Sequence, residues 1–175
     1  MLNRSILLTH TMMPSSPRLS RRIADLEASP IREILAVANR PGMVSFAGGL
    51  PAPETFPTLA LNAAPADALQ YGPSEGAEPL RDPVAAELRA RGMRVPAAQV
   101  LILSGSQQGI DLVAKLCIDA GTPVAVEAPT YLAALQVFRF FGARFVIYSA
   151  DDPGAIGCGG ATLTYCIPTF QNPTG

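Results

Sequence analysis

The chain has 175 residues, of which 49% are hydrophobic and 15% are charged, and its formal net charge is −1. This composition supplies ample material for a folded core and excludes a disordered chain. The nearly neutral charge argues against nucleic acid or an acidic membrane surface as a partner, and no apolar run approaches the roughly 20 residues of a membrane span.

The cysteines and the N-terminus bear on where the protein works. Cys117, Cys158 and Cys166 show no C-x-x-C spacing, which predicts reduced thiols in a reducing compartment, here the cytoplasm. A metal site is not expected, because His10 is the only histidine. Residues 1–17 are interpreted as a disordered leader, with an organelle-targeting peptide as the alternative.

Residues 18–70 are expected to form an N-terminal arm and a substrate-side segment. A helix is predicted to begin at Ser29-Pro30, where a capping hydroxyl precedes a proline at the first helical position, and to end at Pro41-Gly42. Residues 45–57 are rich in glycine and proline and should form an irregular, packed loop.

Residues 71–175 alternate between helix and strand patterns. We expect helices over residues 83–91, 106–120 and 129–141, and strands over residues 100–104, 123–127, 143–149 and 161–167. Apolar strands that alternate with helices predict an α/β fold with a mostly parallel sheet and flanking helices on both faces. Residues 150–160 are too few and too glycine-rich for a crossover helix, so the last two strands are either antiparallel or have lost a segment between them.

The segment Ser104-Gly105-Ser106-Gln107 leads from the first predicted strand into a helix. A tight turn there places free backbone N–H groups and the positive helix end beside the Ser106 hydroxyl, which favours a phosphate site. The alternative is a plain capping serine. Neither a Walker loop nor a dinucleotide fingerprint is present.

Other polar and aromatic residues fall at comparable places. Tyr131 follows the strand over residues 123–127 and could stack on a planar ligand, and Tyr71 lies in a Gly-Pro turn; each has a packing role as its alternative. Asn172 follows the last strand, and open α/β sheets place ligands at such a carboxyl edge.

Together these segments resemble a known family. After Ser29 to Leu35, five motifs occur in one order: Gly48-Gly49-Leu50-Pro51, Tyr71-Gly72-Pro73-Ser74-Glu75-Gly76, Gly105-Ser106-Gln107-Gln108, Glu127-Ala128-Pro129-Thr130-Tyr131 and Asn172-Pro173-Thr174-Gly175. With them, residues 18–175 resemble the N-terminal part of a class I/II, fold-type I pyridoxal-phosphate aminotransferase, most closely the 2-aminoadipate/kynurenine-type branch. Residues 71–175 would then be an incomplete cofactor-binding large domain.

The resemblance implies roles for individual residues. Ser106 and Gln107 would hold the phosphate of pyridoxal 5'-phosphate, Tyr131 would stack on its ring, and Asn172 would bind its phenolic oxygen. Tyr71 would reach the partner's phosphate across a homodimer interface. Gly49 would lie in the mobile segment near the substrate carboxylate.

The chain departs from the family in its lysine. The lysine that holds the cofactor covalently, an aspartate and a carboxylate-binding arginine all follow the Asn-Pro-Thr-Gly turn in family members. Here Lys115 is the only lysine. It matches no catalytic position and is expected to be exposed. The resemblance therefore implies an N-terminal fragment that carries no catalytic residue and is inactive alone.

Two functions remain open at this point. The first is a fragment of an enzyme that moves an amino group between an amino acid and a 2-oxo acid. The second is a non-catalytic remnant that binds a phosphate-bearing ligand or dimerises with an intact homologue. A regulator fused to a winged-helix DNA reader is not favoured, since only about 28 residues precede Ser29.

Overall fold

The computed structural model describes residues 20–23, 37–38, 40–44, 52–56, 70–149, 151–152 and 160–175. The expected leader, most of the helix from Ser29, Gly49 and much of the glycine-proline loop lie outside these residues. Within the arm the structure has two short 3-10 helices, η1 (Arg21–Ile23) and η2 (Pro53–Thr55).

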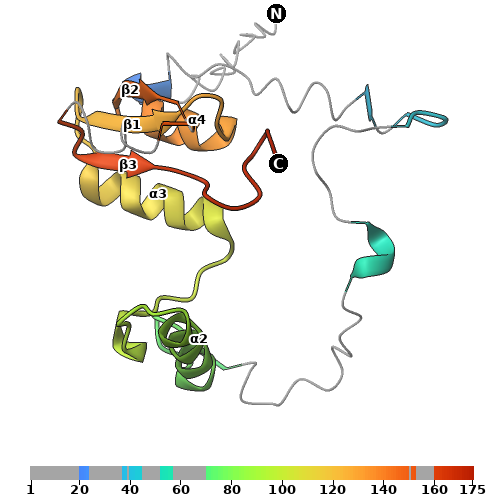
Figure 1. The fold of residues 1–175 in the computed structure, drawn as a ribbon, viewed down its shortest axis with the longest axis vertical. Helices are drawn as coiled ribbons and strands as arrows, with labels where there is room; N and C mark the ends of the chain where they lie inside the picture. Colours follow the sequence, from blue (N-terminus) through green and yellow to red (C-terminus); the bar gives the residue numbers. More distant parts are fainter. Residues whose placement is uncertain are drawn as a thin grey trace, which may run out of the picture.

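Three parallel strands form the sheet on which the candidate site is built (Figure 1). They are β1 (Pro123–Glu127), β2 (Arg144–Tyr148) and β3 (Leu163–Tyr165), in the order β2-β1-β3. The register pairs Val126 of β1 with Ile147 of β2 and with Tyr165 of β3. The central strand is apolar up to Glu127 and buried from Val124 onward, as expected of a strand with neighbours on both sides.

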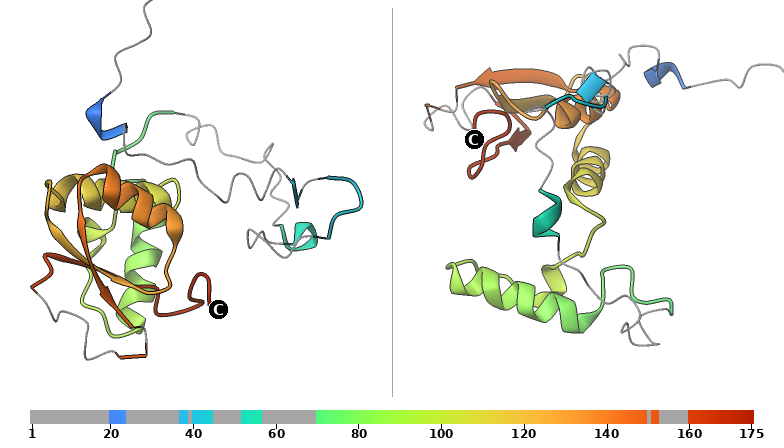
Figure 2. Two further views of the ribbon diagram at one scale, coloured as in Figure 1. Left: turned by 90° about the horizontal axis from the view of Figure 1, so that it is seen from above. Right: turned by 90° about the vertical axis from the view of Figure 1, so that its right-hand side faces the viewer.

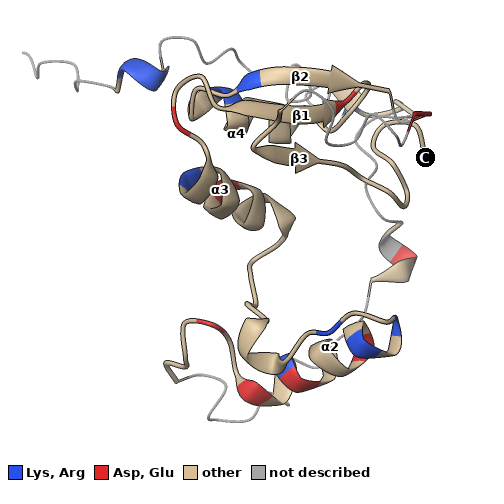
Figure 3. Cartoon of the chain, turned by 60° about the vertical axis from the view of Figure 1, so that its left-hand side comes forward, with Lys and Arg blue, Asp and Glu red and all other residues tan. Residues whose placement is uncertain are grey.

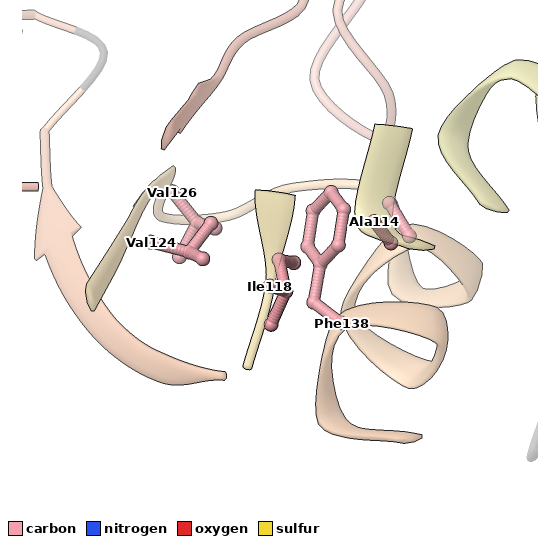
Figure 4. Close-up of a cluster of buried hydrophobic side chains, with 6 residues drawn as sticks. Ala114, Ile118, Val124, Val126 and Phe138 are labelled. Atoms are coloured by element: carbon pink, nitrogen blue, oxygen red, sulfur yellow. The ribbon is translucent and has the colours of Figure 1, made fainter. Parts of the chain in front are cut away.

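Two helices bury one face of this sheet. Helix α3 (Ser106–Cys117) and helix α4 (Leu132–Phe140) contribute to a single core cluster with the central strand. Figure 4 shows the ring of Phe138 of α4 between Ala114 on one side and Ile118, with the valines of β1 beyond it, on the other. The buried members of the cluster are Ala114, Ile118, Val124, Val126, Ala134 and Phe138.

Helix α2 (Glu78–Ala90) stands apart from the sheet and packs on a short 3-10 helix, η5 (Ala97–Gln99) (Figures 1 and 2). Arg81 joins the two, since its Nε donates to the carbonyl of Gly76 at 2.9 Å and its Nη1 to that of Ala97 at 3.2 Å. Figure 3 shows charged residues of both signs along α2. The helix begins at Glu78, five residues before the predicted start, and Pro83 lies inside it.

The predicted strand over residues 100–104 is wrong. These residues have no strand assignment, Leu101 is 50% exposed, and the N–H of Ile102 donates to the carbonyl of Glu75 at 2.9 Å instead of to a strand. Apolar residues become a strand only where a neighbouring strand offers hydrogen bonds. Among the described residues no strand pairs with this segment.

Of the two alternatives for the last two strands, the antiparallel arrangement is excluded. Strand β3 pairs with β1 and not with β2, and it runs parallel to β1. The chain thus passes from one edge of the sheet to the other between β2 and β3. Residues 153–159, in this connection, lie outside the described residues. The expected α/β fold with a mostly parallel sheet and flanking helices is confirmed.

Candidate functional site

The turns that carry the predicted residues Tyr131 and Asn172 lie at the carboxyl edge of the sheet. Strand β1 ends at Glu127 and leads through Thr130 and Tyr131 into α4, and β3 ends at Tyr165 before the C-terminal turn. Because the strands are parallel, both turns lie at the same edge. Figure 1 shows the chain from β3 to the C-terminus leaving from this edge.

The N-terminus of α3 offers backbone donors to a ligand. Its N-cap residue is Gly105, with φ 90° and ψ 165°, and no side chain caps the helix. Ser106 and Gln107 are exposed. The side chain of Gln108 is engaged elsewhere, because its Oε1 accepts from the N–H of Ser104 at 2.7 Å. An uncapped first turn leaves N–H groups and the positive helix end for an anion, so this end fits a phosphate.

Ser106 lies beside strand β3. It borders a cavity of about 220 Å³, together with Thr164 and Tyr165 of that strand. The rest of the lining is mainly apolar and includes Ile110 of α3 and Phe138 of α4. Phe138 packs edge-on against the ring of Tyr165, with 5.5 Å between the ring centroids. Ser106, in the turn predicted to bind phosphate, and the end of β3 thus line the same cavity.

Tyr131 lies near Tyr165, one of the residues that line this cavity. It precedes α4 and packs, half buried, against the core cluster. Burial raises the pKa of Tyr165, and the neighbouring Tyr131 and then Glu127 act in the same direction. Among the described residues, the buried Oγ1 of Thr130 has no hydrogen-bond partner. An aromatic ring and an unsatisfied hydroxyl at one turn fit a ligand that is both planar and polar.

A hydrogen-bonded network joins the two turns of this edge, and sequence reasoning gave its members no role. The carboxylate of Glu127, 7% exposed, accepts from the N–H of Ile167 at 3.1 Å and from Nε2 of Gln171 at 3.3 Å. Gln171 Nε2 also donates to the carbonyl of Pro129 at 2.7 Å. The signal available in the sequence was an acid at the end of an otherwise apolar strand, since a buried carboxylate needs donors.

The other predicted site residues make few or no described contacts with this edge of the sheet. Asn172 follows Gln171 in the exposed turn at the edge, and its side chain has no recorded partner among the described residues. Tyr71 is fully exposed in the segment before α2, and no described contact joins its side chain to the sheet edge. Lys115 is exposed on α3 and pairs with Asp111 one turn away, as expected of a surface lysine. Gly49 lies outside the described residues.

The described helices include none that is long and apolar enough to span a membrane.

The chain is similar to known aminotransferases. The family model for aminotransferase class I and II matches residues 43–162. The chain is 44% identical, over 166 residues, to a 2-aminoadipate transaminase of Thermus thermophilus, and the aligned region covers 86% of this chain and 41% of that protein. It is 39% identical, over 178 residues, to aromatic-amino-acid aminotransferase 1 of Thermococcus litoralis, covering 89% of this chain and 43% of that protein.

Solved structures give the same result. LysN, an alpha-aminoadipate aminotransferase from Thermus thermophilus in complex with N-(5'-phosphopyridoxyl)-L-leucine, has 40% sequence identity and a TM-score of 0.70, covering 90% of this chain and 42% of that one. A kynurenine aminotransferase from Pyrococcus horikoshii has 35% identity and a TM-score of 0.74, covering 90% and 44%. The chain therefore spans less than half the length of these relatives, and its described elements form part of the fold-type I architecture.

Proposed function

The chain belongs to the class I and II aminotransferase family, and we propose that it supplies part of the cofactor site of an enzyme that moves an amino group between an amino acid and a 2-oxo acid. One observation carries this proposal: Ser106, at the uncapped N-terminus of α3, lines a cavity together with Tyr165, and Tyr131 lies near Tyr165. When bound, pyridoxal 5'-phosphate supplies the electron sink on which the amino group is transferred.

The residues of this chain would bind and orient that cofactor. The Ser106 hydroxyl and the N–H groups of Ser106 and Gln107 would donate to the phosphate. The ring of Tyr131 would pack on the pyridine ring, and the side-chain amide of Asn172 would donate to the phenolic oxygen. Tyr71 would act in a partner subunit's site within a cytoplasmic homodimer, and Gly49 would lie near the substrate carboxylate. The similarity to 2-aminoadipate and aromatic-amino-acid aminotransferases supports amino acids as substrates.

Binding is expected to be reversible on this chain and to yield no transamination. Lys115 is the only lysine, and it lies exposed on α3 in an ion pair with Asp111. We therefore place no catalytic residue among the described ones. A saturable label on Lys115 after borohydride reduction, detected by mass spectrometry, would contradict this.

The test is equilibrium dialysis of the 175-residue chain against pyridoxal 5'-phosphate. Ser106→Asp sets a carboxylate where the phosphate would bind, and we expect it to raise the dissociation constant at least about tenfold through like-charge repulsion. Ser74→Asp, in the exposed turn before α2, is the matched control and should leave binding unchanged. Equal weakening by both variants, or by neither, contradicts the phosphate assignment.

A second function is favoured by the complete exposure of Tyr71. In this proposal the chain is a non-catalytic module that binds a phosphate-bearing ligand or dimerises with an intact homologue, with Tyr71 in the interface. Co-expression with a full-length relative, followed by pull-down, tests the dimerisation. Association that is weakened by Tyr71→Ala supports it, and no association rules it out.

A further inference from the structure

The side chain of Gln171 fastens the C-terminal turn to the end of strand β1. Its Nε2 donates to Glu127 Oε2 at 3.3 Å and to the carbonyl of Pro129 at 2.7 Å. Its Oε1 accepts from the backbone N–H of Thr174 at 2.9 Å and from the Thr174 hydroxyl at 2.7 Å. A glutamine amide has two donor protons and two acceptor positions, so this side chain is fully engaged.

The carboxylate of Glu127 is the anchor of this arrangement. It is 7% exposed, and Oε2 receives the N–H of Ile167 at 3.1 Å as well as the Gln171 amide. A buried carboxylate is tolerated where donors satisfy it, and hydrogen bonds to a charged acceptor are stronger than those between neutral groups. Both donors come from the chain after β3, so the charge of Glu127 holds that chain against β1.

The two segments that this network joins are those with the proposed cofactor contacts. Pro129 lies two residues before Tyr131, and Asn172 directly follows Gln171. The Gln171 amide therefore directly joins the turn that carries the aromatic ring to the turn that carries the phenol-binding side chain. Loss of this amide would let the C-terminal turn move away from β1 while leaving the core cluster intact.

We propose that Glu127 and Gln171 are positioning residues of the cofactor site, which act by fixing Asn172 relative to Tyr131 and do not themselves touch the cofactor. This inference rests on the proposed function. It assigns to a buried acid and to the Gln171 amide a task distinct from that of the residues expected to contact pyridoxal phosphate.

The test is a double-mutant cycle on the affinity of the full chain for pyridoxal 5'-phosphate. Gln171→Ala is expected to raise the dissociation constant about tenfold, equivalent to about 1.4 kcal/mol. If Gln171 acts through Asn172, the same change in an Asn172→Ala background should raise it less than about twofold. Gln99→Ala, on the exposed η5 helix, is the matched control and should leave affinity unchanged.

A second readout needs no cofactor. The backbone N–H of Thr174 is expected to exchange with solvent faster in Gln171→Ala, since its acceptor is gone, while amides of β1 keep their protection. Thr174→Val retains the side-chain shape and removes the hydroxyl bond to Gln171. We expect it to raise the dissociation constant for pyridoxal 5'-phosphate by about twofold to threefold. This variant tests the positioning role if Gln171→Ala does not fold.

The outcomes separate the two claims. A parent chain that does not bind pyridoxal phosphate refutes the proposed function. A parent chain that binds, with unchanged affinity in Gln171→Ala and in Thr174→Val, leaves the proposed function standing and refutes the positioning role. Full additivity of Gln171→Ala and Asn172→Ala also refutes it, because Gln171 would then act independently of Asn172.

Discussion

The buried phenol of Tyr148 should make the folded state less stable at alkaline pH. Tyr148 is 6% exposed at the end of β2, and its hydroxyl donates to the carbonyl of Tyr165 at 3.1 Å. Burial raises the pKa of Tyr148 from 10.0 to about 12, and Glu127 and Cys166 act in the same direction. The folded state thus keeps a proton that the unfolded chain releases. The resulting stabilisation is complete below pH 10 and is lost as the pH rises toward 12.

The size of the effect follows from the difference between the two pKa values. A difference of two units corresponds to at most about 2.7 kcal/mol, and at pH 11 about 1.4 kcal/mol of it is lost. Solvent screening at the edge of a small sheet reduces the loss at pH 11 to roughly 0.7 kcal/mol. In Tyr148→Phe the hydrogen bond to Tyr165 is absent, which costs about 1 kcal/mol at neutral pH, but no proton is left to titrate.

The assay is urea unfolding, followed by far-ultraviolet circular dichroism at pH 7 and pH 11. The parent should exceed Tyr148→Phe in free energy of unfolding by about 1 kcal/mol at pH 7 and by less than about 0.5 kcal/mol at pH 11. Tyr71→Phe, at a fully exposed position, should change this free energy by less than about 0.5 kcal/mol at pH 7. A difference between parent and Tyr148→Phe that stays constant or widens with pH would refute the reasoning.

Three further changes test the fold and the site. Gly76 has φ +100°, and an added Cβ would lie 2.5 Å from Cγ1 of Ile102; Gly76→Ala should therefore lower the free energy of unfolding in urea by about 1–3 kcal/mol, more than Gly92→Ala, where only backbone strain arises. Phe138 is 2% exposed in the core cluster, so Phe138→Ala should cost about 3–5 kcal/mol and abolish a cooperative thermal transition, and a retained transition would contradict its central place. Lys115→Ala removes an exposed ion pair and should change stability by less than about 0.5 kcal/mol without changing the dissociation constant for pyridoxal phosphate; a weakened affinity would give Lys115 a role that the structure does not support.

The parts of the fold that sequence could predict are those decided by local pattern. Strand β1 occupies residues 123–127 as predicted, because an apolar run between a Gly-Thr turn and a Pro turn has few other ways to be buried. Residues 100–104 carry a similar apolar run and are not a strand. The difference is that β1 has neighbouring strands, whereas no described strand pairs with residues 100–104, and local sequence pattern does not encode this pairing. Helix α2 begins five residues before its predicted start, because the helix accommodates Pro83 in its interior and does not begin at it.

The candidate site shows the same division. Ser106 and Tyr131 could be singled out because each follows an apolar segment and begins a helix, a local feature. The contact between Glu127 and Gln171 could not be predicted, because it joins residues 44 positions apart and depends on β3 lying beside β1. Sequence pattern therefore indicates which side chains lie at the start of a helix. The hydrogen bonds between distant segments depend on the order of the strands in the sheet.

The position of Lys115 on α3 separates cofactor binding from covalent chemistry in this chain. The helix begins at Ser106 with its open N–H groups, and Lys115 lies nine residues further along the same helix. At a rise of about 1.5 Å per residue this is about 13.5 Å along the axis, farther than an extended lysine side chain reaches. The amine is also turned to solvent and paired with Asp111. A phosphate held at Ser106 would therefore lie beyond the reach of Lys115, and this distance, with the ion pair to Asp111, supports the expectation of reversible binding without a covalent bond.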